Sequence, residues 1–265
     1  MRLPISAPHL ALFIAYLFDR NYAASTVNTY VSALSYSHKL FGLSDPTKTF
    51  FIVQMLKGYG KLGTSVDGRL PITLPILHKI LASASEIFLS DYDRCLFRAM
   101  SSLAFYAFLR VGEMTVTSHV SNPPLSLSNI AKLVNAANQI VSLKVTFLTY
   151  KHSYNQPPFS LIVKRQDNFC PVQFILEYLE LRGNSHGPFF LRGGLPVTRK
   201  YFCDQLALAI KRCGLNPARY KGHSFRIGAA TYAAERGMSD AQIRMLGRWK
   251  SNAFLRYIRV PSMST

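Results

Sequence analysis

A glycine-rich stretch near residue 60 is the feature that most restricts how this chain of 265 residues can fold. Small and turn-forming residues crowd together there: Gly58, Gly60, Gly63, Thr64, Ser65, Asp67, Gly68 and Pro71. Such a composition is typical of an exposed linker, because it offers few side chains to bury and much backbone freedom. We therefore place a domain boundary near residue 66 and expect a small unit over residues 1–66 and a larger one over 67–265.

Helical spacing of apolar residues dominates on both sides of this linker. The expected helices cover about 10–17, 25–40, 49–58, 74–89 and 91–109, and they resume at Pro171 with breaks at 183–194 and 214–222. Only the region 140–164 alternates apolar and polar residues, in two runs around a bend that contains Pro157 and Pro158, which predicts a β-hairpin. The expected fold class is therefore mainly α with a small β-sheet.

The charge of the chain points to a polyanion as its partner. It carries 31 Lys and Arg against 13 Asp and Glu, a formal charge of +18, and the last 70 residues alone contribute +10. This imbalance favours DNA or RNA over a neutral metabolite. The basic residues alternate with apolar ones, unlike a polybasic membrane tail, and the longest apolar run, Leu10 to Phe18, is shorter than the roughly 20 residues of a membrane helix. We expect a soluble protein without a membrane partner.

Nothing in the sequence predicts a metal, a cofactor or a disulfide framework. The four cysteines form no C-x-x-C pair and have no matching histidine spacing, so we expect reduced, mostly buried thiols: Cys95, Cys170, Cys203 and Cys213. The basic C-terminal third holds three acidic residues, too few for the carboxylate cluster of two-metal strand transfer. A Gly-x-x-x-x-Gly-Lys loop for ATP is also absent from the sequence.

Seven side chains stand out, although each alone has an ordinary explanation. Arg110 and Glu113 have the spacing of an i,i+3 ion pair, and Lys151 follows the first expected strand, where a solvated lysine is common. His223 and Arg226 share one helix face just after a glycine, where they could bind an anion together.

The remaining two are aromatic. Trp249 is the only tryptophan of the chain, and a core position is its most frequent environment. Tyr257 is one of 14 tyrosines and would ordinarily be a packing residue.

The order and wording of these residues resemble the tyrosine recombinase (phage integrase) family. Gly-His-Ser-Phe-Arg-Ile-Gly-Ala-Ala-Thr at 222–231, and Leu-Gly-Arg-Trp-Lys-Ser at 246–251 followed by Tyr257, are similar to the two C-terminal boxes of that family. Residues 25–30 are similar to its core-binding domain. The resemblance therefore implies an N-terminal helical DNA-binding domain and a C-terminal catalytic domain. The box around His223 resembles recombinases of eukaryotic mobile elements of the Crypton and DIRS type more than it resembles bacterial Xer proteins, which implies a nuclear protein, or a cytoplasmic one if the source is prokaryotic.

The resemblance also implies a role for each residue. Tyr257 would attack a DNA phosphate and form a 3′-phosphotyrosyl bond. Arg110 and Arg226 would bind the non-bridging oxygens, a task suited to the guanidinium fork. His223 would share the proton of the tyrosine or donate to the phosphate, and Lys151 would protonate the leaving 5′-oxygen.

Two further assignments follow from the family. Trp249 stands where many members have His and others Trp, and its indole N–H can donate to a phosphate oxygen but cannot carry a proton. Glu113 would steady Arg110 or His223. Lys144 and Lys164 lie on either side of Lys151, so the choice of the general acid depends on the register of the hairpin.

The function that we expect is a site-specific DNA recombinase or integrase that needs neither metal nor ATP. Its partners would be double-stranded DNA and further copies of itself, assembled as a dimer or tetramer on DNA, because a charge of +18 per subunit opposes association without DNA. The alternatives are a domesticated DNA-binding protein that no longer cuts, a type IB topoisomerase, and an unrelated RNA-binding module.

Overall fold

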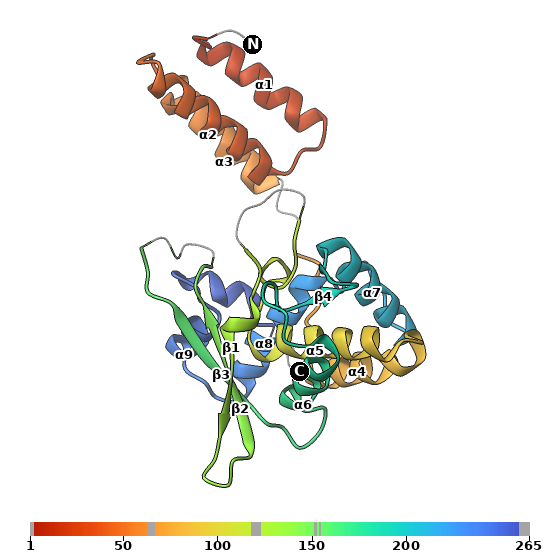
Figure 1. Cartoon of the computed structure of the whole chain (residues 1–265). Coiled ribbons are helices and arrows are strands. Elements are labelled where there is room, and N and C mark those ends of the chain that lie inside the picture. The colour runs from red at the N-terminus through yellow and green to blue at the C-terminus, as the bar shows by residue number, and fades with distance from the viewer. Residues whose placement is uncertain (1–2, 63–66, 118–122, 151–152, 154, 260–265) are drawn as a thin grey trace. The chain divides into compact units, whose positions relative to one another are not determined.

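The computed structural model describes residues 3–62, 67–117, 123–150, 153 and 155–259, and the chain divides into two compact units, Met1–Gly68 and Arg69–Thr265 (Figure 1). Each unit has its own core of buried apolar side chains. The first unit is helical, and the second combines helices with a small antiparallel sheet. This architecture confirms the predicted fold class.

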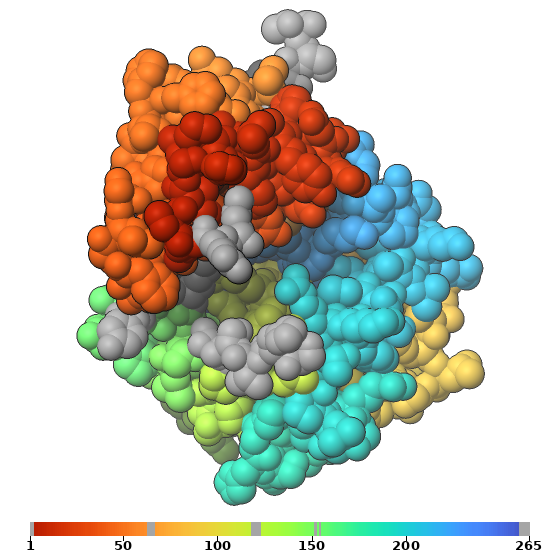
Figure 2. Space-filling model, turned by 90° about the horizontal axis from the view of Figure 1, so that it is seen from above, coloured from red at the N-terminus to blue at the C-terminus, as the bar shows by residue number. Residues whose placement is uncertain are grey.

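The described residues of the first unit form three helices and one 3₁₀ turn. They are α1 (Ala7–Asp19), α2 (Ala24–Leu40), η1 (Pro46–Lys48) and α3 (Phe50–Leu62). Leu10, Ile14 and Leu17 of α1 pack at helical spacing against Val27 of α2 and Ile52 of α3, and all five are buried. In Figure 2 the three helices, red to orange, form one closely packed body.

Helix α3 is longer than the sequence predicts. It continues through Gly58 and Gly60, which the composition assigns to the linker, and ends at Leu62. Tyr59 accounts for the extra turn, because its buried hydroxyl donates to the carbonyls of Tyr22 at 2.7 Å and Leu17 at 3.1 Å. These tertiary bonds offset the low helix propensity of the two glycines.

The second unit has six α-helices among its described residues, arranged around α5 and α8. They are α4 (Leu74–Ile87), α5 (Asp91–Tyr106), α6 (Pro171–Arg182), α7 (Arg199–Arg212), α8 (Gly222–Glu235) and α9 (Asp240–Leu246). Helix α5 packs against α4, α6 and α8, and nearly all of its residues from Leu96 to Phe105 are buried. Within the described part of the chain, no helix is long and apolar enough to cross a membrane.

A three-stranded antiparallel sheet covers one side of this unit (Figure 1). Strands β2 (Ile140–Phe147) and β3 (Phe159–Lys164) form the predicted hairpin, with Phe147 opposite Phe159 and Ser142 opposite Lys164. The sequence analysis missed β1 (Ile130–Val134), which pairs with β2, and the short hairpin of β4 (Leu191–Arg192) and β5 (Leu195–Pro196).

The four cysteines are free thiols at the margin of the core. All four are partly exposed, so the expectation of mostly buried thiols is wrong in this respect. Burial is nevertheless sufficient to raise the pKa of Cys95 and of Cys213.

Helix α8 is buried on almost every side, and a glycine allows its closest contact. The segment just after the linker runs along the start of α8. The N–H of Ile72 donates to the Ser224 carbonyl on α8 at 3.0 Å, and the N–H of Leu70 donates to the carbonyl of Arg219, shortly before α8, at 2.8 Å. A Cβ atom on Gly228 would lie 1.8 Å from the Ile72 carbonyl oxygen. The backbone of residues 70–72 can therefore reach α8 only because residue 228 is glycine.

We predict that Gly228→Ala destabilises the second unit by at least about 3 kcal/mol, because a backbone atom cannot yield as a side chain can. The measurement is the free energy of unfolding in urea. Gly112→Ala is the matched control, since an added Cβ there meets no atom within 4 Å, and it should change the free energy by less than about 0.5 kcal/mol. Equal effects of the two substitutions would contradict this account of the α8 contact.

Candidate active site

Four residues that the sequence singles out meet through their side chains in the second unit. His223 and Arg226 lie on the first turns of α8, Trp249 follows α9, and Tyr257 ends the 3₁₀ helix η4 (Asn252–Tyr257). The ring centroid of Tyr257 is 4.8 Å from that of His223 and 4.9 Å from that of Trp249. The Arg226 Cζ atom lies 4.0 Å from the centroid of the Trp249 ring and 5.8 Å from that of Tyr257. These residues thus form one cluster.

Two glycines allow this cluster to form. A Cβ on Gly247 would lie 1.5 Å from a ring carbon of Trp249, so the indole can fold back over the end of α9 only without a side chain there. A Cβ on Gly222 would lie 2.3 Å from Val111 Cγ2, so the start of α8 can approach the segment beside Arg110. Both glycines belong to the two motif boxes.

Arg226 is a fully buried cation that forms no ion pair with a carboxylate of the described residues. Its guanidinium donates to the carbonyls of Phe108 and Gly247, and Nε has no hydrogen-bond partner among the described residues. Burial, followed by the nearby charges of Arg110 and Arg248, lowers the pKa of Arg226 to about 9. The folded protein therefore holds this charge at a cost that an incoming anion would reduce.

Glu113 holds Arg110 in place. Arg110 follows α5, and η2 (Val111–Glu113) then turns the chain back, so that Glu113 accepts from the Arg110 backbone N–H at 2.9 Å and from Nη1 at 3.1 Å. The i,i+3 ion pair that the spacing predicts is confirmed. The Arg110 side chain remains about one-quarter exposed, which leaves it accessible to a ligand.

The structure adds Arg248, which the sequence analysis did not select. Its side chain is 1% exposed, and Nη2 donates to Glu113 Oε2 at 2.8 Å. Glu113 therefore pairs with two arginines. The sequence offers one signal, the position of Arg248 inside the second motif box, but it cannot distinguish a buried arginine from the many solvated ones in this basic third.

Tyr257 is held through its backbone. The Thr231 hydroxyl on α8 accepts from the N–H of Arg259 at 3.0 Å and lies 3.3 Å from the Tyr257 carbonyl oxygen. Phe254 of η4 is buried, while Tyr257 at the end of η4 remains partly exposed. The phenol is therefore fixed at the surface of the cluster.

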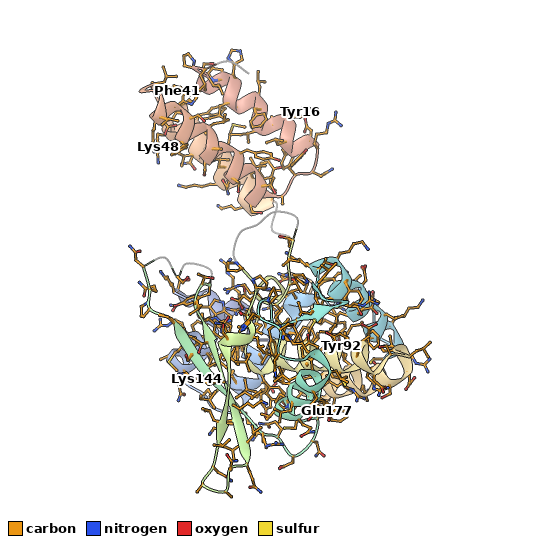
Figure 3. The ribbon with its side chains drawn as sticks, viewed as in Figure 1. Tyr16, Phe41, Lys48, Tyr92, Lys144 and Glu177 are labelled. Atoms are coloured by element: carbon orange, nitrogen blue, oxygen red, sulfur yellow. The ribbon has the colours of Figure 1, made fainter. Side chains whose placement is uncertain are left out.

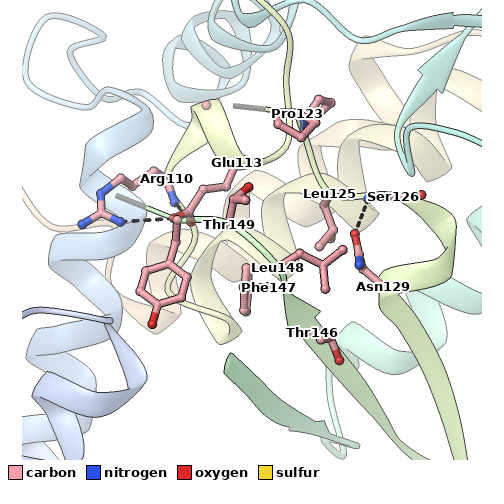
Figure 4. A pocket seen from close by; sticks show the side chains of 13 residues that line it. Arg110, Glu113, Pro123, Leu125, Ser126, Asn129, Thr146, Phe147, Leu148 and Thr149 are labelled. Carbon is pink, nitrogen blue, oxygen red and sulfur yellow. Dashed lines mark hydrogen bonds and ion pairs between the residues drawn. The ribbon is translucent and has the colours of Figure 1, made fainter. Parts of the chain in front are cut away.

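A pocket of about 250 Å³ opens beside Arg110 and Glu113 (Figure 4). Its other wall is the end of β2 and the residues after it, Thr146–Tyr150, and Leu125 and Asn129 contribute from the opposite side. Lys151 itself lies outside the described residues, directly after this wall. Lys144, marked in Figure 3, is exposed in the middle of β2, and Lys164 is exposed at the far end of β3.

The electrostatic balance of the site favours an anion with several oxygens. Three arginines, at positions 110, 226 and 248, share the single carboxylate of Glu113 within the described part of the cluster. The indole Nε1 of Trp249 is also buried without a hydrogen-bond partner among the described residues. A phosphate group could accept from Arg110, Arg226 and the Trp249 indole and neutralise the excess charge.

Comparisons with known proteins identify the fold. No family model matches the sequence, and no curated protein matches it. Among solved structures, the XerH site-specific recombinase bound to a palindromic difH substrate is 16% identical, with a TM-score of 0.65, over 97% of this chain and 67% of that one. A lambda integrase dimer bound to a COC′ core site is 16% identical, with a TM-score of 0.64, over 99% and 82%. The Tn1549 transposon integrase with circular intermediate DNA is 12% identical, with a TM-score of 0.61, over 98% and 83%.

The chain therefore has the fold of the site-specific recombinases and integrases of the tyrosine type, as the resemblance in its motif boxes implies. The likeness extends over nearly the whole chain and includes both units.

Proposed function

We propose that the protein is a site-specific DNA recombinase or integrase, which cuts and rejoins DNA through a covalent bond between Tyr257 and a 3′-phosphate. The observation that carries this proposal is the position of the Tyr257 ring, in contact with His223 and Trp249 and beside the buried guanidinium of Arg226. A tyrosine is a weak nucleophile at neutral pH, and a cationic pocket stabilises both its phenolate and the charge of the transition state.

The reaction follows from these positions. The Tyr257 oxygen attacks the phosphorus, its proton passes to His223, and the bond from phosphorus to the 5′-oxygen breaks. Arg110 and Arg226 bind the non-bridging oxygens, on which charge develops, and the Trp249 N–H donates to one of them. A 5′-hydroxyl of the same or another DNA strand reverses the step. The phosphotyrosyl bond conserves the energy of the broken phosphodiester, so rejoining requires no ATP.

Sheet register supports Lys151 as the group that protonates the 5′-oxygen. The wall of the Arg110 pocket ends at Tyr150, one residue before Lys151. Lys164 pairs with Ser142 and lies five positions after Phe159 at the pocket end of β3, a distance of roughly 17 Å along a strand. Lys144 lies three residues before Phe147, roughly 10 Å along β2. Of the three lysines, Lys151 is the one that follows the pocket wall.

We predict that Lys151→Ala slows cleavage of ordinary DNA by about 10²-fold or more, the usual contribution of a general acid. DNA with a 5′-bridging sulfur has a leaving group that needs no proton, so the variant should cleave it at nearly the wild-type rate. Rates on the two substrates are compared in single-turnover experiments. Lys144→Ala and Lys164→Ala are the matched controls. If either of them cleaves ordinary DNA slowly and the 5′-sulfur DNA at nearly the wild-type rate, that lysine is the general acid.

The proposed function is tested by trapping the intermediate. A nicked suicide substrate, in which the DNA beyond the cut diffuses away, should leave a complex that resists denaturant and disappears with protease. Mass spectrometry of the remaining DNA-linked peptide should identify Tyr257 attached to a 3′-phosphate, in buffer containing EDTA. A linkage through another residue, or to a 5′-phosphate, would overturn the proposal.

Two other outcomes correspond to the alternatives. A protein that binds DNA but forms no adduct with either nicked or supercoiled substrates would be a DNA-binding protein that no longer cuts. An adduct accompanied by relaxation of supercoiled DNA, without exchange between two DNA molecules, would indicate a type IB topoisomerase.

Assembly, origin and location belong to the same proposal. We propose that two or four copies come together on adjacent half-sites, where DNA neutralises the charge of +18 on each subunit. A mobile element is the proposed origin, and the wording of the His223 box supports an element of the Crypton or DIRS type acting in a nucleus. Microscopy of the tagged protein in its host cell tests the location, and exclusion from the nucleus would contradict it.

A further inference from the structure

Arg248 occupies an unusual place, because one guanidinium joins four separate segments around the site. Nη1 lies 3.3 Å from the carbonyl oxygens of Ala107 and Leu246, and Nη2 lies 3.3 Å from that of Phe108. The Cζ atom lies 3.9 Å from the centroid of the Phe147 ring on β2. With the Glu113 ion pair, these contacts connect the end of α5, η2, β2 and the end of α9.

Each of these segments carries part of the candidate active site. The end of α5 leads into Arg110, and Glu113 accepts from both arginines. The Phe108 carbonyl also accepts from Arg226, as does that of Gly247, next to Arg248. A change at Arg248 would therefore act on Arg110 through Glu113 and on Arg226 through the Phe108 carbonyl that both arginines share.

The backbone of Arg248 indicates that its position is specific. Its φ angle is +55°, in the left-handed region that non-glycine residues rarely adopt. Such a conformation persists only where the surrounding contacts enforce it. The buried guanidinium provides those contacts, and it also directs the next residue, Trp249, onto Arg226.

We propose that Arg248 is a positioning residue for DNA cleavage, which orients Arg110 through Glu113 without touching the DNA. This inference rests on the proposed function. The Arg248 guanidinium is committed to Glu113 and to three backbone carbonyls, whereas the Arg110 side chain is about one-quarter exposed and accessible to a phosphate. Arg248 and Arg110 both bind the Glu113 carboxylate. The charged Arg248 thereby fixes the orientation of the carboxylate plane with which Arg110 forms its ion pair.

A second buried arginine provides the matched control. Arg182 is also buried, and its guanidinium donates to the carbonyls of Gly183, Ser185, Pro188 and Phe189. None of these acceptors belongs to the candidate active site. Arg182→Met and Arg248→Met thus both remove a buried guanidinium from the second unit, and only the latter removes a contact with Glu113.

The kinetic experiment separates binding from cleavage. Arg248→Met should slow single-turnover cleavage of suicide DNA by about 10²-fold, as expected for misplaced catalytic groups, while its Kd for DNA, measured with Tyr257→Phe also present, changes less than threefold. Arg182→Met should melt at a lower temperature yet cleave at the wild-type rate while folded. Arg248→Lys should recover about tenfold of the loss, because an ammonium can reach Glu113 but lacks the fork for the carbonyls. If Arg248→Met does not fold, Arg248→Lys replaces it in this experiment and should still cleave more slowly than the wild type.

The double variant tests whether Arg248 acts through Glu113. Glu113→Gln combined with Arg248→Met should be no slower than the slower single variant, since both remove the same ion pair. Independent, multiplied losses would overturn the inference, as would wild-type cleavage by Arg248→Met.

A crystal structure of Arg248→Met or Arg248→Lys decides the question without activity. We expect the Arg110–Glu113 ion pair to lengthen or break in it, and an unchanged pair would overturn the positioning role. If the wild-type protein binds DNA without forming an adduct, the proposed function fails, and this structure still decides whether Arg248 positions Arg110.

Discussion

Tyr257→Phe should bind DNA as the wild-type protein does and form no covalent adduct. The substitution removes one oxygen atom and keeps the ring that contacts His223 and Trp249, so the cluster should stay assembled. Without the nucleophile, adduct formation should fall by at least about 10⁴-fold. Denaturing gels of the suicide-DNA reaction and a binding titration measure the two properties separately.

Tyr232→Phe is the matched control for this experiment. Tyr232 lies on α8, and its hydroxyl accepts from Arg236 Nε at 3.2 Å, at the partly exposed surface of the same unit. We expect this variant to form the adduct at the wild-type rate. An adduct that persists in Tyr257→Phe would show that another residue is the nucleophile.

Arg226→Met should stop cleavage and at the same time raise the stability of the DNA-free protein. Loss of a charged donor to the transition state should slow cleavage by about 10³-fold. In the free protein, however, Arg226 is a buried cation that lies near two other arginines and, in the described part of the chain, pairs with no carboxylate. Methionine has a similar length and no charge, and we expect it to increase the free energy of unfolding by about 2 kcal/mol.

The size of this stability difference depends on pH in a defined way. Because burial lowers the pKa of Arg226 to about 9, the charged side chain opposes folding at every pH below that value. Above it, the folded protein releases the proton more readily than the unfolded chain, so the wild type gains stability relative to Arg226→Met as pH rises. The difference is therefore largest near neutral pH.

Urea denaturation of both proteins at pH 7 and pH 10 measures this effect. Arg244→Met, at an exposed arginine on α9, should change the free energy of unfolding by less than about 0.5 kcal/mol. A marked loss of stability in Arg226→Met would mean that the two carbonyl bonds of Arg226 outweigh its buried charge.

The elements that the sequence predicts well are those defined by their own local signals. Helix α6 begins at Pro171, where a proline fits the first helical turn, and β2 and β3 alternate apolar and polar residues around a proline bend. Strand β1 has no such pattern, because only Ile130 and Leu133 of its five residues are partly buried. Among the described residues it pairs with β2 alone. Its formation depends on pairing that a local reading cannot include.

The residues of the candidate site also divide into those with a local sequence signal and those defined only by tertiary contacts. Spacing and motif wording lead to Arg110, His223, Arg226, Trp249 and Tyr257, and the last four meet in ring and cation contacts. Arg248 was missed because its significance lies in contacts with residues more than a hundred positions away, such as Glu113 and Phe147. Only the folded chain distinguishes it from the exposed arginines nearby.

Because Trp249 stacks on Arg226, the intrinsic fluorescence of the protein can report on the candidate active site. Trp249 is the only tryptophan in the chain, so the intrinsic fluorescence excited near its absorption edge originates from this cluster alone. Its indole is partly buried beside a guanidinium and a phenol, and both the polarity and the charge around it should change when a phosphate enters. The emission of the unlabelled protein should therefore report DNA bound at the cluster of Trp249, Arg226 and Tyr257, separately from any binding elsewhere on its basic surface.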